Sequence, residues 1–119
     1  MKKFLMACSV AALMSTPVLA DDVSGAVYDA ITHGQWSQAE AMLRADLKQN
    51  PQDPARLLNL AFVLQNSGRQ KEAAGVYQQV LQLDQNPMVS VDDPYRISAP
   101  ARAKQVARQG MAQVEKFQR

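Results

Sequence analysis

Residues 68–87 read GRQKEAAGVYQQVLQLDQNP, and a related segment, GQWSQAEAMLRADLKQNP, occupies residues 34–51. The two segments begin 34 positions apart, at Gly34 and Gly68. In each, alanine follows the glycine by five residues, a large apolar residue by nine and leucine by thirteen. Each segment ends in Asn-Pro, two residues later in the second. A fixed period of this length is typical of stacked helical repeats.

The apolar residues of each segment recur at helical spacing, so each segment is predicted to be an amphipathic helix. A similar stripe lies before Gly34 and another in residues 55–67, which predicts a second helix in each unit. Asp53-Pro54 suits the start of a helix, as N-cap and first-turn proline. Gly34 and Gly68 suit helix ends, where a left-handed residue is common. The chain therefore reads as helix, tight turn, helix, twice.

This pattern resembles the tetratricopeptide repeat. The resemblance is carried by Leu57, Leu60, Ala61, Leu64, Gly68, Ala73, Tyr77, Leu81 and Asp84. The first unit, about residues 20–53, departs from the family at Asp46 and Val27, where small or small apolar residues are usual. In the second unit, 54–87, Gln85 replaces the usual proline. The resemblance implies an all-α fold of two antiparallel helix-turn-helix units; a generic pair of helix hairpins is the alternative.

The first 20 residues have the layout of a secretory signal peptide. A basic start precedes an apolar run at 4–14, and Val18-Leu19-Ala20 suits cleavage after Ala20. The run is shorter than the roughly 20 residues of a membrane-spanning helix. Cys8 comes too early in the run to favour a lipidated cysteine. We therefore expect a periplasmic or secreted protein whose mature chain, from Asp21 onward, has no cysteine.

The charge of the mature chain is balanced but unevenly distributed. Without Lys2 and Lys3, 11 basic residues face 11 acidic ones, which argues against a nucleic-acid partner. Residues 21–94 carry five negative charges in excess, and residues 95–119 carry five positive charges in excess. The basic end of the chain is therefore a candidate for contact with an acidic surface.

The residues after the second unit are predicted to form a loop, 88–98, and a helix, 99–119. Asp92-Asp93-Pro94 marks the loop, and Pro100 is placed in the first helical turn. An array of repeats needs a terminal helix with a polar outer side, so residues 99–119 are expected to cap the array. The candidate cationic contacts on this helix are Arg102, Lys104, Arg108 and Lys116. Peripheral binding of anionic membrane or lipopolysaccharide through them is the alternative function.

No pattern in the sequence favours catalysis, a cofactor or a metal. The single histidine, His33, falls at a predicted helix end, where it can hydrogen-bond a terminal carbonyl. One histidine without cysteines or a carboxylate cluster makes a poor metal site. Asp92 and Asp93 lack the further oxygen ligands that calcium requires. Trp36 is expected to pack against a neighbouring helix. We therefore do not expect an enzyme.

The resemblance implies a protein-binding adaptor or scaffold whose groove, lined by the first helix of each unit, holds a peptide or partner protein. Carried over position by position, the groove residues are Ser24, Tyr28, Ile31, Leu58, Asn59, Phe62, Gln65 and Asn66. Tyr28 and Phe62 are the expected apolar anchors. The partner is expected to be an envelope protein, for example in assembly of a pilus, secretion or envelope complex. Two alternatives stay open: the terminal helix covers Leu58 and Phe62, and copies of the chain stack end to end.

Overall fold

The computed structural model describes residues 20–89 and 101–117, and side chains from residue 25 onward. The helices are α2 (Ala20–Thr32), α3 (Trp36–Gln49), α4 (Pro54–Asn66), α5 (Gln70–Gln82) and α6 (Ala103–Phe117). Two short strands, β1 (Met88–Val89) and β2 (Ala101–Arg102), pair antiparallel. The predicted signal segment with Cys8, and residues 90–98 of the predicted loop, lie outside the described residues. The all-α architecture predicted from the repeat is confirmed.

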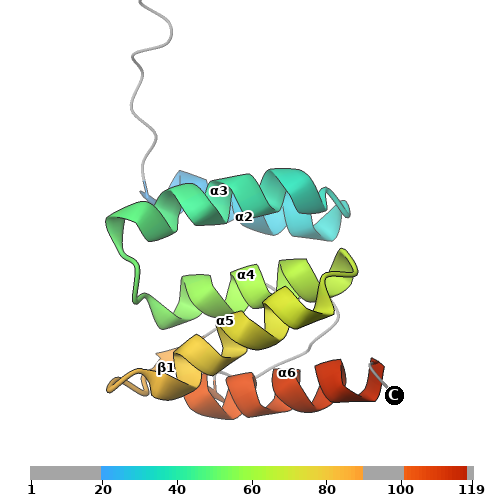
Figure 1. The fold of residues 1–119 in the computed structure, drawn as a ribbon. Coiled ribbons are helices and arrows are strands. Elements are labelled where there is room, and N and C mark those ends of the chain that lie inside the picture. Colours follow the sequence, from blue (N-terminus) through green and yellow to red (C-terminus); the bar gives the residue numbers. More distant parts are fainter. Residues whose placement is uncertain (1–19, 90–100, 118–119) are drawn as a thin grey trace, which may run out of the picture.

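The helices form a stack of antiparallel pairs (Figure 1). The pair α2 and α3 lies at the top of the view, α4 and α5 lie below it, and α6 lies at the bottom. Each helix packs against the next one along the chain, and α6 packs against both α5 and α4. One continuous core runs through the stack, with Ala39, Ala61, Leu64, Ala73 and Val80 all 0 % exposed. In the part of the chain described, no helix is long and apolar enough to span a membrane.

The turns within the two units are built alike. Gly34 has a φ of +69° and Gly68 a φ of +86°, which are left-handed conformations that suit glycine. After each glycine, a backbone N–H reaches back to the preceding helix: Gln35 donates to the Ala30 carbonyl at 2.8 Å and Arg69 to the Leu64 carbonyl at 2.9 Å. These are the bonds of a Schellman motif. The 34-residue repeat seen in the sequence is therefore repeated in the hydrogen bonding of the turns.

Other predicted helix ends are also confirmed. Asp53 is the N-cap of α4, and its Oδ1 accepts from the backbone N–H groups of Ala55 at 3.0 Å and Arg56 at 3.3 Å, with Pro54 in the first turn. His33 Nδ1 lies 2.7 Å from the Asp29 carbonyl oxygen, so the Nδ1–H tautomer donates a hydrogen bond near the end of α2. Both arrangements satisfy backbone groups that a helix leaves unpaired at its ends.

The start of the terminal helix differs from the prediction. Residues 99–119 were expected to be helical, but α6 begins at Ala103, and Ala101 and Arg102 belong to β2. The Ala103 N–H donates to the Pro87 carbonyl, and the Lys104 N–H donates to Oδ1 of Asn86 at 2.9 Å. Asn86 thus accepts from the first turn of α6 from 18 residues away. Pairing with β1 holds residues 101–102 extended, and no local capping signal could reveal it.

Helix α6 matches α4 in sequence and burial. Residues 54–56 and 100–102 both read Pro-Ala-Arg. The four buried positions that follow have the same spacing in the two helices: Leu57, Leu60, Ala61 and Leu64 in α4, and Ala103, Val106, Ala107 and Gly110 in α6. The shift between them is 46 residues, twelve more than the repeat period. Helix α6 therefore occupies the place of the first helix of a third unit.

Candidate partner-binding surface

The predicted groove residues divide into buried and accessible side chains. Ile31 and Leu58 are each 1 % exposed and Asn59 is 6 % exposed. Tyr28 is 44 % exposed, Asn66 is exposed, and Phe62 and Gln65 are half-buried. The side chain of Ser24 lies outside the described residues. The predicted groove residues therefore do not all lie on the accessible surface.

The burial of Leu58 and Asn59 corrects their expected place in an open groove. Helix α4 contacts α3, α5 and α6, so it is enclosed on three sides and eight of its 13 residues are buried. Ile31 belongs to the core between the helices of the first unit. The structure favours the alternative in which the chain's own elements cover Leu58, whereas Phe62 keeps part of its surface.

Gln65 is engaged within the protein. Its Oε1 accepts from the Tyr77 hydroxyl at 2.8 Å, and its Nε2 donates to Oε1 of Gln113 at 3.3 Å. This amide joins α4 to α5 and α6, so its hydrogen bonds hold the stack together. Asn66 is different, because its Nδ2 donates locally to the Phe62 carbonyl and the residue is exposed. Tyr28, Phe62 and Asn66 are therefore the accessible members of the predicted site.

The structure adds Trp36 to this surface. The Trp36 and Phe62 rings meet edge to face, with centroids 6.3 Å apart and planes at 74°. This contact confirms that Trp36 packs against a neighbouring helix, although it is the first residue of α3 and not a turn residue. Trp36 is half-buried, so part of its side chain remains accessible. Trp36 also lines a hollow of about 630 Å³ with the rest of residues 34–38 and with Asn66 and Ser67.

The hollow lies where the two intra-unit turns come together. These turns are stacked at one edge of the molecule, on the right in Figure 1. Sequence reasoning missed the hollow because its lining is contributed by two turns that are 34 residues apart. The available signal was Trp36, an aromatic residue two positions after the turn glycine, which we expected to pack against a neighbouring helix.

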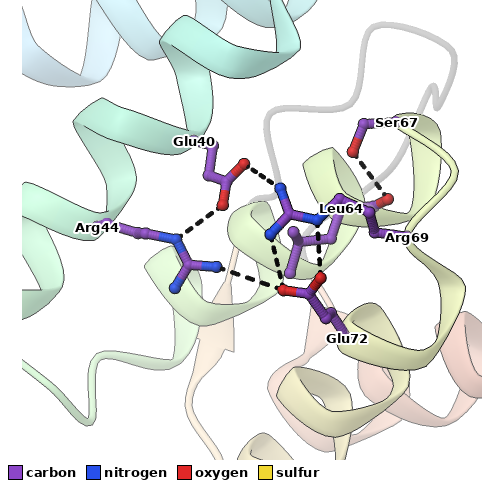
Figure 2. Close-up of polar contacts among 6 residues, drawn as sticks. All are labelled: Glu40, Arg44, Leu64, Ser67, Arg69 and Glu72. Atoms are coloured by element: carbon purple, nitrogen blue, oxygen red, sulfur yellow. Dashed lines mark hydrogen bonds and ion pairs between the residues drawn. The ribbon is translucent and has the colours of Figure 1, made fainter.

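A cluster of four charged residues, Glu40, Arg44, Arg69 and Glu72, lies between α3 and the start of α5 (Figure 2). Arg69 pairs with Glu40 of α3 and, at 2.7 Å, with Glu72 of α5. Within α3, Arg44 Nε donates to Glu40 Oε2 at 2.8 Å. The two units are joined by the pair of Arg69 with Glu40 and by that of Arg44 with Glu72, at 3.9 Å. Hydrogen bonds from Arg44 and then from Arg69 hold the pKa of the Glu40 carboxyl below its ordinary value of 4.5, against the opposing effect of burial.

This shift predicts an acid-dependent loss of stability. Because the pKa of Glu40 is lower in the folded chain than in the unfolded chain, its contribution is complete at neutral pH and is lost as the pH falls below about 4.5. Between pH 7 and pH 3 the wild type should lose about 0.5 kcal/mol more than Glu40→Gln, a small value because these arginines are 40 % and 48 % exposed. Urea unfolding at each pH measures the difference, and parallel pH profiles for the two proteins contradict it.

The four cationic residues predicted to contact an anionic surface are not equivalent. Arg108 and Lys116 are exposed on α6, whereas Lys104 is half-buried near the start of the helix. Arg102 belongs to β2, and its Nη1 donates to the Asn86 carbonyl at 3.2 Å. The apolar stripe of α6, which includes Ala103, Val106 and Val114, is buried. Only the polar side of this helix is therefore available to an external surface.

The described side chains form no group of three or more histidine, cysteine, aspartate or glutamate residues able to hold a metal ion. Glu40, Arg44, Arg69 and Glu72 are ion-paired with one another. The hollow is lined by Trp36 and by amide and hydroxyl side chains, which suit apolar contact and hydrogen bonding.

A sequence model of the tetratricopeptide repeat matches residues 30–90. The chain belongs to the tetratricopeptide repeat family. This match spans half of the chain and includes both intra-unit turns and the helices α3, α4 and α5. No curated protein and no solved structure matches the chain. Tetratricopeptide repeats are in general protein-interaction modules, and the family is typically non-catalytic.

Proposed function

We propose that this tetratricopeptide protein is an adaptor of the bacterial periplasm that holds a peptide or partner protein of the cell envelope. The observation that carries the proposal is the partly accessible edge-to-face pair of Phe62 and Trp36, with Asn66 lining the same hollow as Trp36. Tyr28, on α2, is a further accessible aromatic residue and is 44 % exposed. Aromatic side chains of this kind supply much of the binding energy at protein interfaces. The layout of residues 1–20 as a secretory signal supports the location.

Photo-crosslinking in cells tests this function. A photoreactive amino acid in place of Tyr28 should give a discrete protein adduct, identified by mass spectrometry. Phe62→Glu and Asn66→Lys should each reduce that adduct at least fivefold, because both put charge on the contact surface. Asn66 is exposed, so its variant should remain folded. Gln52→Lys, in the loop between α3 and α4, is the control and should leave the adduct unchanged. An adduct that persists in both variants contradicts the proposal.

A second candidate function is electrostatic contact with an anionic membrane or lipopolysaccharide. The observation in its favour is the exposure of Arg102, Arg108 and Lys116. Each such cation contributes on the order of 1 kcal/mol near a charged leaflet. With the apolar side of α6 buried, binding would be electrostatic and would disappear at high salt. Co-sedimentation with anionic vesicles at low salt, lost when all three residues are changed to glutamine, supports this candidate; no sedimentation of the wild type rejects it.

A further inference from the structure

The hollow at the turns is uncharged throughout. Its lining consists of residues 34–38, Asn66 and Ser67, which are glycine, tryptophan, serine, glutamine and asparagine residues. The charged residues nearest in sequence, Glu40 and Arg69, are paired with each other in the cluster of Figure 2. A charged ligand group placed in the hollow would meet no opposite charge in the lining, whereas a neutral group finds hydrogen-bonding amide and hydroxyl side chains. The lining therefore selects for a neutral ligand.

The hydrogen-bonding groups around Trp36 are available. Among the described residues, no partner is found for the side chains of Gln35, Ser37 and Gln38, and Gln35 does not cap α3 with its side chain. Amide side chains both donate and accept hydrogen bonds, and so does a polypeptide main chain. The half-buried Trp36 ring offers an apolar surface between them. The hollow thus combines one apolar contact with groups that match a peptide backbone.

The hollow is also formed before any ligand binds. The left-handed glycines Gly34 and Gly68 and their Schellman hydrogen bonds fix the two turns, and the contact between Trp36 and Phe62 orients the indole. A preformed site loses little conformational entropy on binding. The hollow has a volume of about 630 Å³ and is open to solvent, so an extended segment of a partner can lie across it.

We propose that this hollow recognises an uncharged segment of the partner protein, with one apolar side chain on Trp36 and main-chain groups hydrogen-bonded to Gln35, Ser37 and Gln38. The inference rests on the proposed adaptor function and names the chemistry of its partner. A peptide is favoured over other neutral ligands because the family binds proteins and because Phe62, in contact with Trp36, extends the apolar contact beyond the hollow. The specificity of the site then comes from the absence of charge.

An array of capped nine-residue peptides tests this chemistry on the folded protein. Each peptide has Leu, Phe or Trp at its centre. The flanking residues are Ser, Asn and Gly in the neutral set, Asp and Glu in the acidic set, and Lys and Arg in the basic set. The neutral set should bind at least tenfold more strongly than either charged set. Ser37→Glu and Ser37→Lys should each weaken that binding at least fivefold. Ser37 is exposed in the first turn of α3, so either charge should leave the fold intact.

Gln52→Glu and Gln52→Lys are the matched controls, because Gln52 is also exposed but lies in the loop between α3 and α4, and they should bind like the wild type. Preference for a charged set, or an opposite response to the two Ser37 variants, overturns the inference. Retention of a neutral oligosaccharide in place of the peptides also overturns it. If no peptide binds while the Tyr28 probe still captures a partner, this inference fails and the adaptor function stands. If neither occurs, both fail.

Discussion

Replacing Gly110 by alanine is expected to lower the free energy of unfolding by about 2 kcal/mol, although alanine is the better helix former. A Cβ atom on Gly110 would lie 2.5 Å from Cε1 and 2.7 Å from Cε2 of Tyr77. The Tyr77 ring is 4 % exposed and its hydroxyl is held by Gln65, so the ring has no room to swing away. Helix α6 would have to move off α5. Thermal unfolding should show a midpoint lower by roughly 10 °C.

Gly75→Ala is the control for this change. Gly75 also lies inside a helix, α5, but a Cβ atom there would meet nothing within 4 Å. That variant should gain about 0.5–1 kcal/mol from helix propensity alone. Tyr77→Leu should cost less in the Gly110→Ala background than in the wild type, because it removes the clash, and a double-mutant cycle measures this coupling. Equal stability of Gly110→Ala and the wild type would show that α6 is not packed as described.

Much of the fold could be predicted because the deciding residues lie close together in the sequence. The stripes of the helices, the N-cap at Asp53 and the left-handed glycines at 34 and 68 are local signals. The contact between Tyr77 and Gly110 could not be predicted, since it joins residues 33 positions apart. The same holds for Asn86, whose side chain accepts from the first turn of α6.

The candidate site was predicted less well than the fold. The family resemblance places groove positions along the first helix of each unit, and Tyr28, Phe62 and Asn66 are indeed accessible. It assumes, however, that these helices face solvent. Leu58 and Asn59 are buried, on a helix that packs against α3, α5 and α6. The hollow at Trp36 depends on two distant turns, so the sequence pattern of one unit does not reveal it.

Asp46 shows how a departure from the family pattern can be compensated. The family favours a small apolar residue at this place in α3, yet Asp46 is only 24 % exposed on its side chain. Its Oδ2 accepts from Arg56 Nε at 3.0 Å, and Arg56 Nη1 lies 2.9 Å from the N-cap carboxylate of Asp53. The hydrogen bond from Arg56 to Asp46 is the main reason why the pKa of Arg56 is raised. One guanidinium therefore joins the first unit to the start of α4.

Arg56→Leu is expected to lower the free energy of unfolding by about 2 kcal/mol, because it leaves two half-buried carboxylates without their partner. Asp46→Ala should cost about 1 kcal/mol, since Arg56 keeps its bond to Asp53. The double variant, with Asp46→Ala and Arg56→Leu, should be less stable than Asp46→Ala alone, because Asp53 has also lost its partner. It should nevertheless be less destabilised than the sum of the two single changes by about 1 kcal/mol, because the hydrogen bond between Arg56 and Asp46 is lost only once. Urea unfolding at neutral pH measures all three.

The comparison with Arg44→Leu separates this link from an ordinary surface ion pair. Arg44 also bonds a carboxylate, but its side chain is 48 % exposed against 28 % for Arg56, so its loss should cost at most about 0.5 kcal/mol. If the two arginine variants lose the same stability, the pairing of Asp46 with Arg56 is no stronger than a solvent-exposed pair. The first unit would then be held on α4 by apolar packing, and the aspartate would be tolerated at that position without being needed there.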